Sequence, residues 1–79
     1  MDDRVEYHMT YEYLDKRGYR RMVDKKYYND EVFLREYKKI VSNIGKEKGP
    51  IELPYVVKSV NGELGRVFDV EREMCNNGE

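Results

Sequence analysis

The sequence predicts an α+β fold in which a four-stranded antiparallel sheet carries one helix on one face, with the chain order β-β-α-β-β. Three observations lead to this prediction. Apolar and polar residues alternate over 5–13, an apolar stripe at helical spacing runs over 33–44, and an Asn-Gly pair at 61–62 separates two further strand-like runs. The 79 residues are enough for a single small domain with one core.

The first strand is expected over 5–13, because apolar or aromatic residues at every odd position give a strand one packed face. Asp15 and Gly18 are favoured at the two ends of a type I turn, where Gly18 can adopt a positive φ. This turn would pair Asp15 with Tyr19. The further pairs that follow are Tyr13 with Arg21, Tyr11 with Val23, Tyr7 with Tyr27, Glu12 with Met22, His8 with Lys26 and Glu6 with Tyr28.

A helix is expected to begin at Asn29 or Asp30, either of which can cap its free N–H groups. Gly45 is well placed to end the helix in the left-handed conformation. The apolar stripe of the helix consists of Phe33, Leu34, Tyr37, Ile40, Val41 and Ile44. We expect Phe33, Tyr37, Ile40 and Ile44 to pack on the sheet with Val57 and Phe68.

The second hairpin is expected over 55–70, with Pro54 at its entry and Asn61-Gly62 as a two-residue turn that pairs Val60 with Glu63. A crossover through the helix places the first strand between the second and the third, which gives the spatial order 2-1-3-4. The chain is expected to be ordered over about 4–72, with a frayed tail at 73–79. On this register the face that meets the helix contains Tyr55, Val57, Leu64, Phe68 and Val70.

The composition predicts a cytoplasmic protein. No run approaches the ~18 apolar residues that a membrane span needs, and the acidic start of the chain does not resemble a signal peptide. Cys75 is the only cysteine, so a reducing compartment is expected. Ala and Gln are absent while Lys, Tyr and Glu are abundant. This usage is compatible with the AT-rich genomes of many phages and mobile elements, and also with a thermophile.

The residues that carry chemistry do not form a catalytic set, so we expect a protein that is not an enzyme and needs no cofactor. His8 is the only histidine and lies in mid-strand on the solvent-facing side. The available nucleophiles occupy no strand-to-helix elbow. One His, one Cys and scattered carboxylates supply no zinc or calcium site. The run 45–49 lacks the spacing of a phosphate-binding loop.

The charge is segregated along the chain and points to the first hairpin as the binding surface. Residues 16–39 carry nine bases against four acids, a net charge of +5, whereas 1–15 carry −4 and 50–79 carry −3. Tyrosines are interleaved with these bases. The candidate partner-binding residues are Lys16, Arg17, Tyr19, Arg20, Arg21, Lys25, Lys26 and Tyr28.

Three interpretations of this segment stay open. Tyr, Met and Arg are favoured at protein interfaces, and eight tyrosines exceed what so small a core can bury with satisfied hydroxyls. Bases with aromatics also suit a nucleic-acid-binding module. Alternatively, the bases only keep an edge strand soluble.

Our leading hypothesis is a small binding protein that occupies another protein, such as a phage or mobile-element inhibitor of a host defence system. The assignment to binding proteins depends on the absence of a catalytic set and on the residue types of the first hairpin. A nucleic-acid partner is the alternative and a homodimer a further one. No membrane partner is expected.

Overall fold

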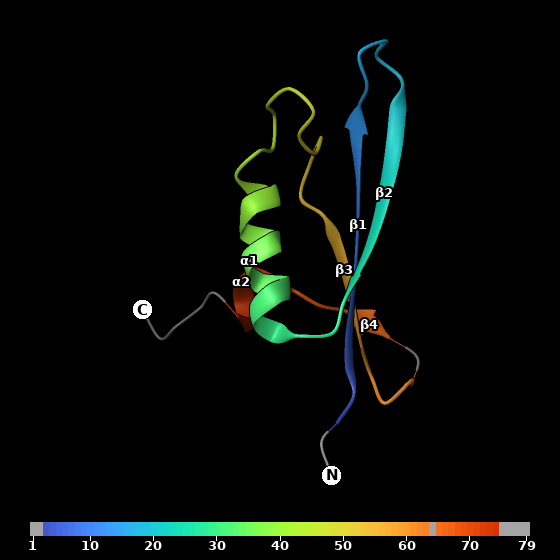
Figure 1. Ribbon diagram of the computed structural model, residues 1–79, viewed down its shortest axis with the longest axis vertical. Coiled ribbons are helices and arrows are strands. Elements are labelled where there is room, and N and C mark those ends of the chain that lie inside the picture. Colours follow the sequence, from blue (N-terminus) through green and yellow to red (C-terminus); the bar gives the residue numbers. More distant parts are fainter. Residues whose placement is uncertain (1–2, 64, 75–79) are drawn as a thin grey trace.

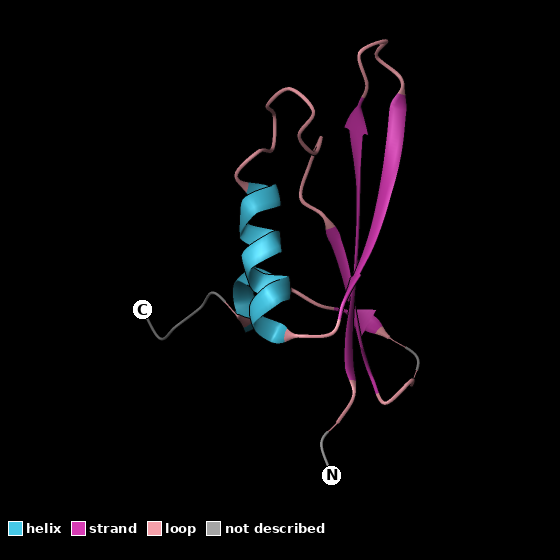
Figure 2. Ribbon diagram, viewed as in Figure 1, coloured by secondary structure: helices cyan, strands magenta, loops and turns pink. Residues whose placement is uncertain are grey.

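The structure, a computed structural model, describes residues 3–63 and 65–74. The four strands form one antiparallel sheet in the spatial order 2-1-3-4, which confirms the predicted α+β topology. Both helices lie on the same side of this sheet (Figures 1 and 2), and neither is long and apolar enough to cross a membrane. The elements are β1 (Val5–Leu14), β2 (Arg20–Tyr27), α1 (Asp30–Val41), β3 (Tyr55–Val60), β4 (Arg66–Val67) and α2 (Val70–Glu73).

β1 and β2 form a hairpin with the predicted register. The N–H of Asp15 donates to the carbonyl of Tyr19 at 2.9 Å. Gly18 adopts a φ of 86°, and its N–H closes the turn on the Asp15 carbonyl at 2.9 Å. The confirmed pairs are Tyr13 with Arg21, Glu12 with Met22, Tyr11 with Val23, His8 with Lys26 and Tyr7 with Tyr27. The expected pair of Glu6 with Tyr28 lies past the end of β2.

α1 begins where the sequence predicts and ends earlier. The side chain of Asn29 accepts a hydrogen bond from the Val32 N–H at 3.0 Å, so Asn29 is the N-cap. The regular helix stops at Val41, and residues 42–45 continue it in tighter turns. Gly45 then adopts a φ of 81°, which is the left-handed conformation expected for it.

The core lies between α1 and the side of β1 and β3 that faces it. The ring of Tyr7 stacks on Phe33 at a centroid distance of 4.2 Å, and Phe68 approaches Tyr7 edge-on at 5.6 Å. The Tyr7 hydroxyl donates to Asp30 at 2.7 Å. Burial, and then this carboxylate, raise the pKa of Tyr7 above its ordinary value. The buried core residues are Tyr7, Met9, Phe33, Tyr37, Ile40, Val56 and Val70.

β3 turns the opposite face to the core from the one expected. Val56 is buried, whereas Tyr55 and Val57 point to the open side of the sheet. Pairing with β1 decides the face, because the buried Met9 lies opposite Val56. As a consequence of this pairing, Lys58 also lies on the helix side of the sheet, opposite Tyr7. Its ammonium group sits 5.1 Å from the centre of the Phe68 ring, where cation–π attraction and a long apolar stem make the position tolerable.

The expected fourth strand over 64–70 is much shorter, because only Arg66–Val67 pairs with β3. The Asn61-Gly62 turn forms as expected, and the N–H of Glu63 donates to the Val60 carbonyl at 3.1 Å. The ladder beyond it is displaced, so β4 has one more residue than β3 between turn and ladder. Gly65 lies in this stretch, and a Cβ there would overlap the side chain of Val57.

The segment expected to end the last strand and begin the tail forms α2 instead. The side chain of Asp69 caps it by accepting from the Arg72 N–H at 3.2 Å. Val70 is buried and Met74 packs against the core, so this short helix closes one end of the core. Leu64, Cys75 and the rest of the expected tail lie outside the described residues.

Candidate functional site

The eight candidate residues lie on or beside β2, which is an edge strand of the sheet. α1 reaches β2 at Tyr27, whose ring centre lies 5.9 Å from that of Phe33. The other end of β2 rises past the end of α1 to the hairpin tip (Figure 1). All eight side chains are exposed, which is what a binding surface requires: Lys16, Arg17, Tyr19, Arg20, Arg21, Lys25, Lys26 and Tyr28.

β2 divides its cations between the two sides of the sheet. Because successive side chains of a strand alternate, Arg21 and Lys25 share the helix side with the core positions of β1. Arg20 and Lys26 point to the open side, with Met22 between them. Three further candidates form the tip of the hairpin: Lys16, Arg17 and Tyr19.

Tyr28 is separated from the other candidates. The eight residues of β2 lie between it and Tyr19, so the two tyrosines are about 30 Å apart at the rise of a strand. Its neighbours are acidic, since it lines an open hollow with Asp3, Asp30 and Glu31. We therefore use the name basic hairpin surface for the other seven residues: Lys16, Arg17, Tyr19, Arg20, Arg21, Lys25 and Lys26.

Two arginines of the basic hairpin surface are paired with carboxylates of β1 and the turn. Arg20 Nη1 lies 3.1 Å from Glu12 Oε1, and Arg21 Nε lies 2.9 Å from Asp15 Oδ2. Such exposed pairs stabilise a fold little, but they hold each guanidinium in place. The four remaining cations make no ion pair within residues 3–63 and 65–74: Lys16, Arg17, Lys25 and Lys26.

Asp15 orders the tip of the hairpin. Its Oδ1 accepts hydrogen bonds from the backbone N–H groups of Tyr19 and Arg17, both at 2.9 Å. These bonds, the one from Tyr19 above all, and the Arg21 guanidinium hold the pKa of Asp15 below its usual value. The tip therefore presents Lys16, Arg17 and Tyr19 from a fixed turn.

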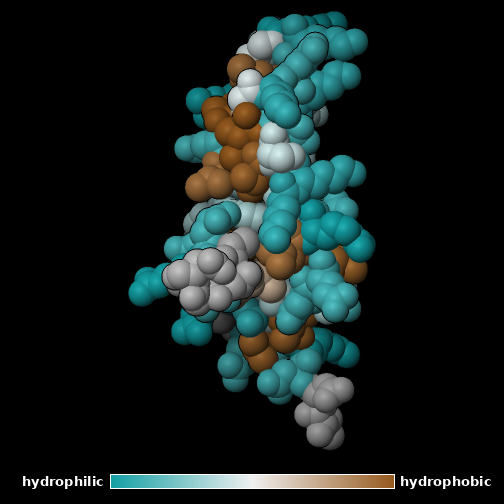
Figure 3. Space-filling view, turned by 90° about the vertical axis from the view of Figure 1, so that its left-hand side faces the viewer, coloured by the Kyte–Doolittle hydropathy of each residue, from teal (hydrophilic) through white to brown (hydrophobic). Residues whose placement is uncertain are grey.

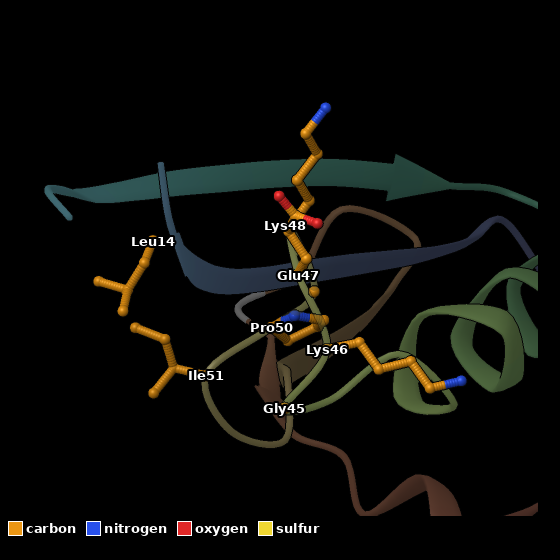
Figure 4. Close-up of a pocket in the computed structure, with 8 residues that line it drawn as sticks. Leu14, Gly45, Lys46, Glu47, Lys48, Pro50 and Ile51 are labelled. Atoms are coloured by element: carbon orange, nitrogen blue, oxygen red, sulfur yellow. The ribbon is translucent and has the colours of Figure 1, made fainter. Parts of the chain in front are cut away.

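Large apolar side chains are exposed beside these cations. Tyr19 is 61% exposed and Met22 is 68% exposed. Leu14 at the end of β1 points the same way as Ile51, next to a hollow of about 410 Å³ (Figure 4). Seen from the helix side, apolar side chains also reach the surface in the upper half of the molecule, among polar ones (Figure 3). The upper half of the hairpin therefore combines apolar contact area with charge.

The sequence analysis missed the part of the site that the 45–51 loop supplies. The loop meets the end of β1 because the N–H of Ile51 donates to the Glu12 carbonyl at 2.9 Å and Pro50 forms a bridge with Tyr13. Lys48 then shares a hollow of about 440 Å³ with residues of the hairpin: Tyr11, Tyr13, Asp15 and Lys16. No local pattern announces this contact, since it joins residues more than thirty positions apart.

His8, the one histidine, lies on the open side of β1 and is half-buried. Its Nε2 is 2.6 Å from Glu6 Oε2, so the imidazole is oriented by that carboxylate. Thr10 is the next residue on the same side of β1, and its hydroxyl is directed to Asp24 at 3.4 Å. Over the described parts of the chain, no three His, Cys, Asp or Glu side chains cluster closely enough to hold a metal ion. What the basic hairpin surface offers a ligand is charge, hydrogen-bond donors and the exposed aromatic ring of Tyr19.

Comparisons with protein-family models, with curated proteins and with solved structures find no match. The functional argument therefore depends on the geometry of the basic hairpin surface and on what that geometry can recognise. The relevant features are an edge strand, four cations that make no ion pair within the described part of the chain, and exposed Tyr and Met side chains.

Proposed function

We propose that this is a non-enzymatic binding protein that acts by occupying another protein through the basic hairpin surface. The observation that supports the proposal most is the exposure of Tyr19 and Met22 among the six cations of the hairpin. Keeping an edge strand soluble requires only charge, and Lys or Arg alone would do so. Exposed Tyr and Met add contact area of the kind that protein interfaces favour.

The arrangement of the charges favours a protein over nucleic acid. A phosphate backbone is tracked best by a continuous row of unpaired cations. Here the cations are divided between the two sides of β2 and the tip, and Arg20 and Arg21 already contact carboxylates. The net charge of −1 also weakens non-specific attraction to a polyanion.

Binding of single-stranded nucleic acid is the second candidate, and the hollow beside the hairpin tip favours it. Tyr11 and Tyr13 line this hollow together with Lys16 and Lys48. Aromatic rings on which bases stack, next to ammonium groups that neutralise phosphates, are the components of a single-strand site. Asp15 in the same hollow opposes such binding.

As to setting, we propose a cytoplasmic inhibitor encoded by a phage or mobile element, with a host protein such as a defence component as its partner. The support is compositional: a single cysteine and the absence of Ala and Gln beside many Lys, Tyr and Glu residues. A small protein without a catalytic set can inhibit simply by covering a surface that its partner needs.

Tyr19→Ser tests the proposal, with Tyr28→Ser as the matched control. The two tyrosines are 61% and 65% exposed but lie at opposite ends of β2. The tagged protein and both variants are used to capture proteins from nuclease-treated lysate of the source cells, and circular dichroism checks the fold. We expect Tyr19→Ser to weaken capture of a discrete protein at least fivefold and Tyr28→Ser to leave it unchanged. Equal capture by all three would exclude the hairpin tip from the interface.

The same preparation separates the second candidate. If the hairpin binds single strands, affinity for an oligonucleotide must fall with added salt, with a log–log slope of about −0.7 for each neutralised phosphate. Lys16→Glu with Lys48→Glu, which reverses the charge of both ammonium groups in the hollow, should then abolish binding to every sequence. We expect no such binding at 150 mM salt, and micromolar binding that these substitutions remove would place nucleic acid first.

A further inference from the structure

We propose that the free edge of β2 accepts an extended acidic segment of the partner protein, which pairs with β2 as a fifth strand. This inference rests on the proposed function and names how the partner is held. It requires three properties of β2: unsatisfied backbone groups along the edge, a reason why a second copy does not take them, and side chains that select an acidic strand.

The backbone of β2 supplies the first property. Along a strand of an antiparallel pair, every second residue exchanges backbone hydrogen bonds with the residue opposite. The residues between them point their N–H and C=O groups away from the partner strand. The bond from the Asp15 N–H to the Tyr19 carbonyl sets this alternation, and Tyr13 with Arg21 is the next hydrogen-bonded pair. The N–H and C=O groups at the intervening positions of β2 therefore point to the free edge: Arg20, Met22, Asp24 and Lys26.

A contact on the other side of β1 supports this assignment independently. The carbonyl of Glu12 accepts from the Ile51 N–H at 2.9 Å, so it points away from β2. Glu12 lies opposite Met22, and the two do not exchange hydrogen bonds. The backbone groups of Met22 consequently face outward, at the middle of a free edge about 25 Å long.

The order of charges along β2 disfavours a second copy of the chain. β2 carries four cations and Asp24, a net charge of +3. If two copies paired antiparallel about Val23, Arg20 would lie opposite Lys26 and Arg21 opposite Lys25. Like charges directly across a ladder are destabilising, so the same residues that disfavour self-pairing in this register favour a strand of opposite charge.

The side chains of β2 also define the pattern of the incoming strand. On the helix side, the half-buried Val23 lies between Arg21 and Lys25. An antiparallel partner would therefore carry acidic residues opposite the two cations and an apolar residue opposite Val23. On the open side the exposed Met22 offers a second apolar contact. The strongest anchors are Lys25 and Lys26, which make no ion pair within the described parts of the chain.

The probe is a synthetic peptide, Glu-Glu-Thr-Val-Val-Glu-Glu with blocked ends, whose length matches the stretch from Arg20 to Lys26. Its matched control has the same sequence with methyl groups on the amides that would face β2, which removes the hydrogen bonds and keeps the charge. We expect the methylated peptide to bind at least tenfold more weakly. We also expect the unmethylated one to slow amide hydrogen exchange at Arg20, Met22, Asp24 and Lys26. Equal affinity of the two peptides would refute strand addition.

Two protein variants complete the test. Lys25→Glu with Lys26→Glu should weaken the peptide at least tenfold. Met22→Pro should also weaken it, because it removes an outward N–H at an edge where proline leaves the β1–β2 ladder intact. Circular dichroism and the amide spectrum establish that each variant is folded, and a Met22→Ala control separates the loss of the N–H from the loss of the side chain. Unchanged binding by both folded variants would overturn the inference.

The outcome is separable from that of the proposed function. If Tyr19→Ser abolishes capture of a protein while the peptide does not bind, the protein-binding function holds and strand addition fails. If neither capture nor peptide binding occurs and a single-stranded oligonucleotide binds in a salt-dependent way, both proposals fail together.

Discussion

The two halves of the first hairpin share one ladder and differ in what covers them. Near the start of β1, Tyr7 is buried against Phe33 and its hydroxyl is bound to Asp30. Beyond the end of α1 the same alternation of residues continues, but Tyr13 is only half-buried and Tyr19 is exposed. The alternation of residues along β1 thus determines which side of the sheet is apolar. The length of α1 determines how much of that side is buried and contributes to stability. The helix does not cover the remainder of that side.

The largest effect that this comparison predicts is in the covered half. Phe33→Ala removes a fully buried ring that contacts Tyr7, Tyr27 and Tyr37. We expect it to lower the free energy of unfolding by about 3–5 kcal/mol, which would leave a domain of this size largely unfolded. Urea titration followed by circular dichroism measures the change. The neighbouring Val32→Ala, on the exposed side of α1, should cost less than about 1 kcal/mol, and a similar loss for both would show that the helix face is misassigned.

A pair of substitutions in β3 tests which side of the sheet is covered. Val56→Ala empties a buried position and should lower the free energy of unfolding by about 2 kcal/mol. Val57→Ala changes the same side chain on the open side, so we expect a loss of under about 1 kcal/mol. Thermal melts of the two variants side by side give the ranking. The reverse order would restore the face that the sequence pattern suggested.

The smallest expected effect is in the free half, where Asp15 holds the tip. Its pKa is lowered in the folded protein, so its ionised form stabilises the hairpin above the unfolded value of about 3.9. That contribution is lost as the pH falls through the lower folded value. Wild type should therefore melt higher than Asp15→Asn at pH 7, with the difference shrinking as the pH falls below the unfolded value of about 3.9. A constant difference across this range would mean that the carboxylate charge is not what matters.

Features with local determinants could be predicted from the sequence. The Asp15–Gly18 turn sets the hairpin register, and Asn29 marks the start of α1. The failures occur where distant pairing decides. The face that β3 turns to the core is set by its pairing with β1, where Met9 lies opposite Val56. This pairing places Lys58 on the helix side, so the apolar pattern of β3 alone predicts the opposite face. The displacement of the β3–β4 ladder, which shortens β4, corresponds to no recognisable sequence pattern and could not be predicted.

For the candidate site, the sequence predicts that the side chains are exposed, but it does not predict which residues come together in space. All eight candidate side chains are exposed, because they lie on an edge strand or directly beside it, and α1 reaches that strand at Tyr27, which is not one of them. The separation of Tyr28 follows from the length of β2. Lys48 and Ile51 join the hairpin only through the contact of the 45–51 loop with β1, for which the sequence has no short-range signal.

The central place of β1 has a consequence for the order in which the chain folds. β1 and β2 are joined by a short turn, so their ladder closes on the microsecond timescale of hairpins. The other edge of β1 must wait for β3, because Val5 pairs with Val60 across more than fifty residues and closing that loop is slow. Until then β1 itself is an open edge without the lysines that guard β2. The nascent chain is therefore most exposed to mispairing on the side that the native protein conceals.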